Sequence, residues 1–349
     1  MSERIAVVGG GPAGVTFALK LALESNYKID LYCKSYGKAC GEVVPEDSLK
    51  YMLVEPVVLN EICSHELRIE GSIKYKINSA ARWFAIDKKE WINRMRKEAL
   101  KAGVRIIGSW TTPESIVTNE YKIVVDARGP LSNNVFPKLI VGRFVVDCKI
   151  EDTAVLDFYP TKIGFAWIFP WGDKANVGAG FMSVKSPRLF IRSYASENLP
   201  KHTVLNEKYS LITIGYPSKK SFYSNYKIIR IGEAAGFVYP VTGEGIRPSI
   251  KHASEVASAL ARDVRVEELW SYTLKGPLST VVNEIKSQYK ILRAISRLGW
   301  KDRVECMNSL SIEFYRKLMK GQVDVYRGAI DVFKSSPSLA FKVLTSILL

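Results

Sequence analysis

The 349-residue chain is long enough for about two domains, and its 47% apolar and 24% charged residues are typical of a folded globular protein. Its longest apolar stretches are interrupted by lysine or arginine before the roughly 18 residues that a membrane-spanning helix needs. Five cysteines without a CxxC spacing and three scattered histidines indicate neither a disulfide framework nor a metal site.

The net charge of +15 is spread along the chain without a run of five or six basic residues, which argues against nucleic-acid binding. Attraction to an anionic membrane surface stays open. The N-terminus has the pattern of a strand rather than of a signal peptide. We therefore expect a cytoplasmic protein, with the inner face of the membrane as a second location.

A glycine-rich turn follows the first predicted strand. Residues 2–8 have the apolar pattern of a buried strand, and residues 9–14 read GGGPAG. Gly9 would allow a tight turn, Gly11 would let the backbone approach a pyrophosphate, and Gly14 would let the next helix pack against its strand.

The elements after this turn support a nucleotide site. The predicted helix at 15–25 would point its N-terminal N–H groups and positive dipole end at the phosphates. A second strand at 28–33 completes a βαβ unit. This context favours dinucleotide binding over a plain structural turn.

The chain is then predicted to leave the first sheet and to return to it. A polar loop at 34–44 lies near the nucleotide. The pattern next predicts short strands at 66–71, 73–78 and 81–86, a helix at 88–102, and strands at 104–109 and 121–126. The last strand ends in a sharp turn at 126–130.

The second half begins with strands and ends with helices. The pattern predicts strands at 145–150, 154–159, 164–170 and 175–182, a short helix near 187–198 and a strand near 203–215. Residues 226–231 are expected to return to the first sheet and to precede a helix at about 243–262. From residue 266 to 349 the pattern is helical, with breaks near 276, 299, 321 and 336.

Five separated motifs in residues 1–262 are similar to those of one family. They are the turn at 9–14, Cys40-Gly41, the turn at 126–132, FAWIFP at 165–170 with NVGAG at 176–180, and GEAAGFVYPVTGEGIR at 232–247. On these motifs the chain resembles the geranylgeranyl reductases, flavoproteins of the aromatic-hydroxylase-like superfamily.

The resemblance implies an α/β fold: a glutathione-reductase-like FAD-binding Rossmann domain, an inserted antiparallel substrate sheet and a C-terminal helical region. The implied FAD-binding domain is discontinuous and comprises residues 1–65, 103–141 and 226–262. The β-rich substrate domain would comprise residues 66–102 and 142–225, and the helical region residues 263–349.

FAD is the cofactor that the resemblance implies. The residues expected to bind it are Gly9, Gly11, Pro12, Ala13, Gly14, Cys33, Cys40, Gly41, Ala127, Gly129, Gly232, Glu233, Gly236, Pro240, Gly243, Gly245 and Ile246. The helix that starts near Gly243 would place its positive dipole end against the flavin ring, where it would stabilise the anionic reduced flavin. No metal is expected.

Four positions depart from the family pattern, one of them Phe165, which lacks the hydroxyl of the tyrosine more often found there. Cys33 stands where an acid usually binds the adenosine ribose, and a thiol lacks the two strong acceptor oxygens of a carboxylate. Arg128 replaces the aspartate of an Asp-Gly turn. Glu233 replaces an aspartate but keeps the negative charge, which favours a retained FAD site.

The implied activity is reduction of carbon–carbon double bonds in isoprenoid chains, such as the geranylgeranyl groups of archaeal-type ether lipids. An isolated alkene accepts hydride poorly, so a proton must reach the other carbon. The site would need an apolar tunnel, a proton donor and a place for an anionic head group. Seven aromatic residues between 158 and 181 suit the tunnel, although aromatics at strand spacing also form ordinary cores. The expected substrate-binding residues are Phe165, Trp167, Phe169 and Pro170.

Cys40 and Tyr239 are the candidate catalytic residues. Cys40 would lie beside the flavin, where it could donate a proton or shape the site; a small buried hydrophobe is the alternative. Tyr239 would order substrate or water, and core packing explains it equally well.

Two other functions and several partners stay open. The alternatives are a flavin monooxygenase or hydroxylase of the same superfamily, and a non-catalytic flavin electron carrier or lipid-binding protein. The expected partners are an isoprenoid or lipid substrate and an electron donor, either a protein or NAD(P)H, together with peripheral contact at the membrane.

Overall fold

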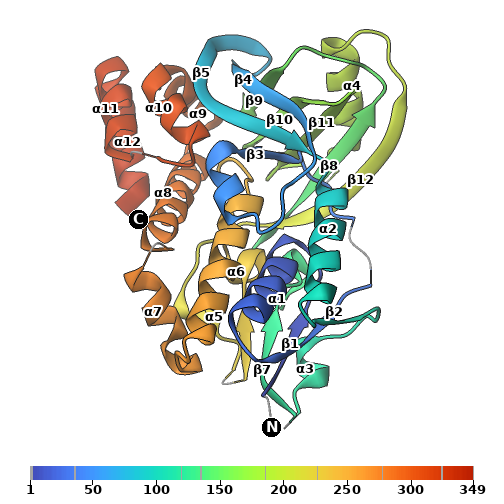
Figure 1. The fold of residues 1–349 in the computed structure, drawn as a ribbon. Coiled ribbons are helices and arrows are strands. Elements are labelled where there is room, and N and C mark those ends of the chain that lie inside the picture. Colours follow the sequence, from blue (N-terminus) through green and yellow to red (C-terminus); the bar gives the residue numbers. More distant parts are fainter. Residues whose placement is uncertain are drawn as a thin grey trace.

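The computed structural model describes residues 3–34, 37–118, 120–133, 136–184, 186–225, 227–276, 278–323 and 325–348. Two β-sheets and a set of C-terminal helices make up the molecule (Figure 1). The smaller sheet has five parallel strands in the order β13-β7-β1-β2-β6. Their bounds are Ile228–Arg230, Tyr121–Asp126, Arg4–Val8, Lys28–Tyr32 and Arg105–Ile107.

Helices cover this parallel sheet because its strands are apolar on both faces. Helix α1 (Pro12–Glu24) connects β1 to β2, so the predicted βαβ unit is confirmed. It packs against α6 (Ile246–Ala261) and α2 (Lys88–Lys101), which flank it in Figure 1. Of the strand predicted at 226–231, residue 226 lies outside the described residues, and the observed strand is Ile228–Arg230.

The larger sheet has eight strands in the order β12-β8-β11-β10-β9-β4-β5-β3. Their bounds are Val204–Thr213, Lys138–Val146, Lys174–Phe181, Gly164–Trp171, Thr153–Tyr159, Val58–Ile69, Ser72–Ile86 and Val43–Pro45. Neighbouring strands are antiparallel except β4 and β9, which are parallel. The prediction of a purely antiparallel sheet was therefore wrong at this pair.

Two local predictions also need correction. The three short strands expected between 66 and 86 are two long ones, β4 and β5, joined at Glu70 and Gly71, both with positive φ. Strand β4 pairs with β5 and β9, and β5 pairs with β4 and β3, so their polar residues stay in extended conformation. Bulges accommodate the shifts in register between β4 and β5. The strand expected at 145–150 is β8, which ends at Val146 and begins at Lys138, because it pairs with β11 and β12.

The two faces of β10 belong to different cores. Phe165, Trp167 and Phe169 lie on one face, which the C-terminal helices cover, as the alternation of a strand requires. Ala166 and Ile168 face the other way, toward α4 (Arg188–Asn198).

The C-terminal helices are α7 (Leu269–Lys275), α8 (Leu278–Arg297), α9 (Trp300–Ser309), α10 (Ile312–Met319), α11 (Val325–Ser335) and α12 (Pro337–Leu348). The four predicted breaks each separate two helices, but the break between α9 and α10 at residues 310–311 was not predicted. Short helices complete the fold: η1 (Glu46–Tyr51), α3 (Pro113–Ile116), η2 (Gly129–Leu131), α5 (Lys219–Phe222), η3 (Gly232–Ala235) and η4 (Val266–Glu268). Within the described ranges, no helix combines the length and the apolar character needed to cross a membrane.

Candidate functional site

A cavity of about 730 Å³ lies between the parallel sheet, the larger sheet and the C-terminal helices. Its volume is in the range of small-molecule sites. Most of the residues predicted to form the site line it: Gly9, Gly11, Pro12, Ala13, Cys40, Gly41, Ala127, Gly129, Phe165, Trp167, Phe169, Glu233, Tyr239, Pro240, Gly243, Gly245 and Ile246. Gly14, Cys33, Pro170, Gly232 and Gly236 lie outside the lining. The structure thus brings segments more than 200 residues apart to one space.

The glycine turn between β1 and α1 is closely packed. Gly9 has φ +115°, which disfavours any residue with a side chain, and a Cβ on it would lie 2.5 Å from the carbonyl oxygen of Ala127. A Cβ on Gly14 would lie 1.8 Å from the carbonyl oxygen of Gly9. Helix α1 starts at Pro12 without a side-chain cap. Its first N–H groups therefore stand at the cavity in the arrangement that suits a phosphate.

The loop with Cys40 and Gly41 is held by a buried amide. Asn176 of β11, fully buried, donates from Nδ2 to the carbonyl oxygens of Cys40 (3.1 Å) and Gly41 (2.9 Å). Its Oδ1 accepts a 3.0 Å hydrogen bond from the indole N–H of Trp167, which sets the orientation of the amide. A Cβ on Gly41 would lie 2.8 Å from the Phe169 ring, so only glycine lets the loop lie on that ring.

Cys40 lies at the edge of the cavity with its thiol in a defined place. The backbone N–H of Glu42 donates to the Cys40 sulfur at 3.4 Å. Glu42 itself is buried with φ +57°, a conformation that costs energy for a residue with a side chain. The segment from Lys38 to Cys40, just before this sharp turn, runs along the cavity wall.

Charged groups gather at the same end of the cavity. Lys38 forms an ion pair with Glu233, whose other oxygen accepts the backbone N–H of Thr213 at 2.9 Å. Glu42 accepts a hydrogen bond from buried Arg143 at 3.0 Å. Lys88, also buried, lies 3.9 Å from the same Glu42 oxygen.

This polar end therefore holds three cationic side chains around two carboxylates. Lys38, Lys88, Glu42 and Glu233 all line the cavity. A bound pyrophosphate would meet positive charge here as well as the N-terminus of α1. The sequence analysis did not single out Lys38 or Lys88, since neither stands in a recognisable spacing, and it included Asn176 only as the first residue of the NVGAG motif.

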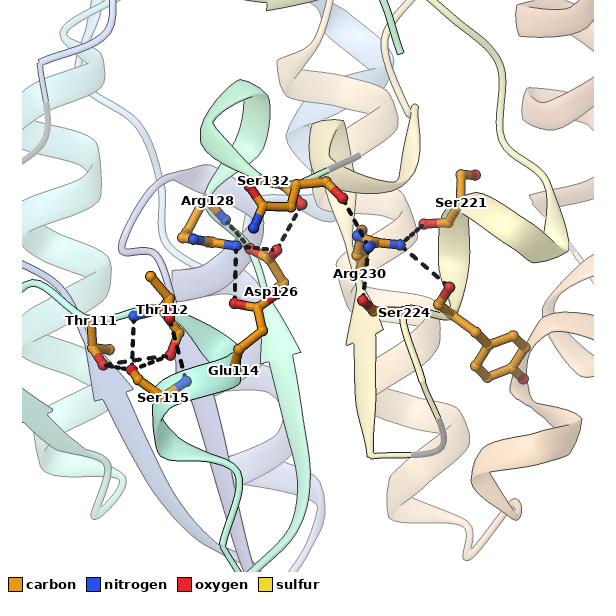
Figure 2. Close-up of polar contacts among 12 residues, drawn as sticks. Thr111, Thr112, Glu114, Ser115, Asp126, Arg128, Ser132, Ser221, Ser224 and Arg230 are labelled. Carbon is orange, nitrogen blue, oxygen red and sulfur yellow. Dashed lines mark hydrogen bonds and ion pairs between the residues drawn. The ribbon is translucent and has the colours of Figure 1, made fainter. Parts of the chain in front are cut away.

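The turn after β7 is fixed by the residue that replaces the usual aspartate. Arg128 donates from Nε and Nη2 to the two carboxylate oxygens of Asp126, both at 2.9 Å (Figure 2). Ser132 also donates to Asp126 at 2.7 Å, and Glu114 lies 3.9 Å from Arg128. The Arg128 guanidinium thus stabilises the turn in which Arg128 lies, by binding Asp126 two residues earlier. Gly129 follows with φ +61°.

Arg230, at the end of β13, ties the neighbouring loops together. Figure 2 shows it beside Ser221 and Ser224, and its guanidinium donates to the Ser221 carbonyl oxygen (3.3 Å) and the Ser224 hydroxyl (2.8 Å). The chain next enters η3, which contains Glu233. The position of this carboxylate is therefore fixed by the end of the parallel sheet.

Cys33 packs beneath the glycine turn and lines no part of the cavity. A Cβ on Gly10 would lie 2.4 Å from the Cys33 Cβ, so the two residues are in close contact. Burial raises the pKa of the Cys33 thiol. Arg96 donates to the Gly10 carbonyl oxygen at 3.0 Å and reinforces the turn from α2. Cys33 therefore supports the turn in its observed place.

Tyr239 lies at the cavity wall with its hydroxyl turned to α8. The hydroxyl donates to Glu284 at 2.7 Å, and burial raises the Tyr239 pKa well above its usual value. The Arg247 guanidinium stacks over the ring at 5.2 Å. Arg247 also pairs with Glu244 (2.7 Å) and Asp47 (3.0 Å), so it is a buried structural contact rather than a free phosphate ligand.

Helix α6 begins at the cavity. Gly245 at its N-cap provides no side-chain cap, and Gly243, Gly245 and Ile246 line the space in front of it. Behind it, His252 accepts the Gly232 N–H at Nδ1 (3.0 Å), and its ring stacks on Phe237. Burial lowers the His252 pKa to about 3, so the ring is neutral and can accept this bond.

The opposite end of the cavity is apolar. Phe165, Trp167 and Phe169 of β10 meet side chains of the C-terminal helices there. The helices contribute Leu292, Ile295, Met307, Tyr315, Leu318 and Met319. Of the seven aromatic residues expected to form a tunnel, Tyr159 and Phe181 pack on the far face of the sheet instead. In the described ranges, no group of histidine, cysteine and acidic residues is placed to hold a metal.

Comparison with known proteins points to one group of enzymes. The chain is 28% identical over 207 residues to a digeranylgeranylglycerophospholipid reductase of Methanococcus vannielii, covering 56% of the chain and 51% of the relative. It is 24% identical over 331 residues to a geranylgeranyl diphosphate reductase of Rhodobacter capsulatus, covering 82% of each. The resemblance to geranylgeranyl reductases is confirmed. The match to the first of these relatives spans only about half of its length.

Solved structures show the same fold as this chain. A geranylgeranyl bacteriochlorophyll reductase-like protein of Thermoplasma acidophilum superposes with a TM-score of 0.75 at 16% identity, covering 99% of this chain and all of that one. A flavin-dependent brominase gives a TM-score of 0.66 at 13% identity, covering 95% and 97%. The chain matches no protein-family model.

Proposed function

We propose that the protein is a flavin-dependent oxidoreductase that reduces carbon–carbon double bonds of isoprenoid chains in membrane ether lipids or their precursors. The observation that carries this proposal is the single cavity with two chemically different ends. One end offers a helix N-terminus and lysines, and the other offers apolar side chains of β10 and of three C-terminal helices. The names of the relatives agree with such a substrate.

FAD is the flavin that we propose for the polar end. The residues fit it: Gly9 and Gly11 line the cavity in front of α1, and the cations Lys38, Lys88 and Arg143 outnumber the carboxylates Glu42 and Glu233 at this end, which suits a pyrophosphate. The start of α6 would face the flavin ring. With this cofactor the fold would be of the glutathione-reductase-like class, with the domain division given above.

The chain's own residues would hold the alkene and supply the proton. When bound, the reduced flavin supplies the hydride. Phe165, Trp167 and Phe169 would hold the apolar chain against it, and Asn176 fixes the loop that carries Cys40. We propose that the Cys40 thiol donates the proton to the alkene. Tyr239 would hold the cavity wall in place through the hydrogen bond from its hydroxyl to Glu284.

The test uses purified protein and three measurements. A flavin absorption spectrum establishes the cofactor, anaerobic reduction with dithionite loads the electrons, and mass spectrometry follows a digeranylgeranyl glycerophospholipid in detergent. We expect the lipid to gain one H₂ per reduced bond. A colourless protein would refute the cofactor, and oxidation of NADPH that depends on an aromatic substrate would favour the hydroxylase instead.

The Cys40→Ser variant tests the proton donor. A serine hydroxyl is a far weaker acid than a thiol, so the rate should fall by roughly 100-fold, the scale of one general acid. Bound flavin should be unchanged, and Cys148→Ser, in the larger sheet region away from the cavity lining, is the matched control. Parental turnover by Cys40→Ser with flavin bound would remove Cys40 from the mechanism.

A further inference from the structure

The last two helices carry an apolar stripe that faces solvent. Tyr326, Ile330 and Phe333 of α11 follow one another at helical spacing, and Phe341 and Leu344 of α12 continue the pattern. All five side chains are exposed, Tyr326 by 84% and Phe341 by 74%. We call these five residues the outer stripe.

Both helices contribute exposed residues to the outer stripe. Backbone bonds from Ser336 N–H to Val332 and from Ala340 N–H to Ser336 connect the end of α11 directly to the start of α12. The opposite face packs inward through Val332, Leu339, Ala340 and Val343. Figure 1 shows α11 and α12 at the outer edge of the molecule, remote from the parallel sheet.

The charges beside the stripe are positive. Among the described residues of α11 and α12, the exposed charged side chains are Arg327, Lys334 and Lys342. Asp331 is turned inward, where it accepts the hydroxyl of Ser311 at 2.6 Å. Lys342 also pairs with Asp302 of α9 at 3.0 Å. Residues 289–349 contain eleven lysines and arginines against five acidic residues.

The neighbouring helix adds an aromatic anchor. Trp300 is the first residue of α9, and Asp302 of the same helix pairs with Lys342 of α12. Trp300 is 59% exposed. Tryptophan and tyrosine beside lysine are typical of side chains that sit at the boundary of a lipid bilayer.

We infer that the outer stripe docks the protein on an anionic bilayer surface. An apolar face flanked by cations fits anionic lipid. A second copy of the chain would instead bring like charges together. The inference deepens the proposed function and rests on it for the lipid substrate: the inner faces of α8, α9 and α10, beneath these helices, line the apolar end of the cavity.

The test measures sedimentation of the full-length protein with vesicles of phosphatidylcholine, with and without phosphatidylglycerol. The triple variant Ile330→Ser, Phe333→Ser, Phe341→Ser should bind anionic vesicles at least about tenfold more weakly, since it removes most of the insertable apolar surface. Leu189→Ser, 79% exposed on α4, is the matched control and should bind like the parent.

A charge variant separates the two contributions. Lys334→Gln should weaken binding to anionic vesicles by about fivefold and leave binding to neutral vesicles unchanged. Equal binding by the triple variant and its parent would overturn the inference. So would a parental dimer that the triple variant converts to monomer without any vesicle binding, because a second copy would then cover the stripe.

Activity in detergent distinguishes this inference from the proposed function. The triple variant should reduce a detergent-solubilised lipid at the parental rate, because its substitutions lie outside the cavity. A parent that binds vesicles but reduces no isoprenoid chain would refute the proposed reaction and leave the docking face standing. A melting temperature equal to that of the parent confirms that the variant is folded.

Discussion

The two ends of the cavity are built by different means. At the polar end, short turns such as the one from Gly9 to Gly14 place backbone groups, and each turn follows directly from a strand of the parallel sheet. At the apolar end, β10 and helices more than 100 residues later place side chains through packing alone. The polar end therefore depends on backbone geometry, and the apolar end on shape.

Two glycine substitutions, one beside each end of the cavity, should give the largest effects on stability and flavin binding. In Gly14→Ala the new Cβ would lie 1.8 Å from the backbone oxygen of Gly9, and in Gly178→Ala 2.1 Å from the Trp167 ring. Both should lose about 3 kcal/mol of unfolding free energy. Only Gly14→Ala should also lose its flavin, because only there does the phosphate turn move.

Flavin absorbance per protein and urea denaturation measure these two effects. Gly71→Ala serves as a control for a glycine with open space around it, although its φ of +82° adds a small cost. A Gly14→Ala protein that retains full flavin would contradict the assignment of the turn. Loss of flavin in Gly178→Ala would show that the two ends are not independent.

Asn176 connects the two ends, and its removal should reduce stability by a similar amount. Asn176→Ala leaves the Trp167 indole and the carbonyl oxygens of Cys40 and Gly41 without partners in a buried place. We expect a loss of about 3 kcal/mol in unfolding free energy. In a Cys63→Ser background, alkylation of Cys40 should also become faster, because the loop is released.

Asn206→Ala is the matched control, since Asn206 is an exposed asparagine on β12 of the same sheet. Urea denaturation and mass-resolved alkylation give the two readouts. If Asn176→Ala and Asn206→Ala behaved alike in both, the amide would not hold the loop.

The polar end can be predicted from the sequence better than the apolar end, because it is built from local backbone turns rather than from packing between distant residues. The turn at 9–14 has a local signature because each glycine is required by a tight turn or a close backbone contact that involves residues near it in the sequence. Strand β7 was predicted with its observed bounds, Tyr121–Asp126. The βαβ unit around α1 is also confirmed.

Contacts between distant residues leave no such signature. Lys38 pairs with Glu233 across 195 positions, and Asn176 reaches Cys40 across 136. The need for glycine at position 41 comes from the Phe169 ring rather than from φ. The cover of β10 by α9 and α10 likewise depends on three-dimensional packing, which the helical pattern of residues 266–349 does not specify.

Acid should destabilise the protein through two buried histidines, His65 beside Trp83 and His252 behind Gly232. Burial lowers the pKa of His65 to about 4 and that of His252 to about 3, from 6.5. The unfolded chain then binds more protons than the folded one below pH 6.5. Stability is full above that pH and falls as the pH is lowered, by about 1.4 kcal/mol per pH unit for each histidine until its folded pKa is reached.

Replacing either histidine tests this slope. His252→Gln and His65→Gln should each reduce the loss of unfolding free energy between pH 6.5 and 4.5 by about half. Urea denaturation at several pH values gives the slopes. An unchanged slope in both variants would mean that other groups cause the acid sensitivity.

The smallest expected difference is between the hydroxyls of buried Tyr239 and half-buried Tyr75. Tyr239 donates to the Glu284 carboxylate at 2.7 Å, and Tyr75, beside the apolar end, donates to the Leu310 carbonyl oxygen at 3.1 Å. A bond to a charged acceptor contributes more, so Tyr239→Phe should cost about 2 kcal/mol at pH 8 and Tyr75→Phe about 1 kcal/mol.

The pH dependence of this difference identifies its cause. Burial raises the Glu284 pKa, and the Tyr239 hydroxyl counteracts that rise. A raised folded pKa gives a stabilising contribution that is present at low pH and is lost as the pH rises through it. Removing the hydroxyl raises the pKa further, so the cost of Tyr239→Phe should shrink toward pH 4, where Glu284 is protonated, while the cost of Tyr75→Phe stays constant. Unfolding free energies at pH 4.5 and 8 measure both, and a constant cost for Tyr239→Phe would show that Glu284 is not charged in the folded protein at pH 8.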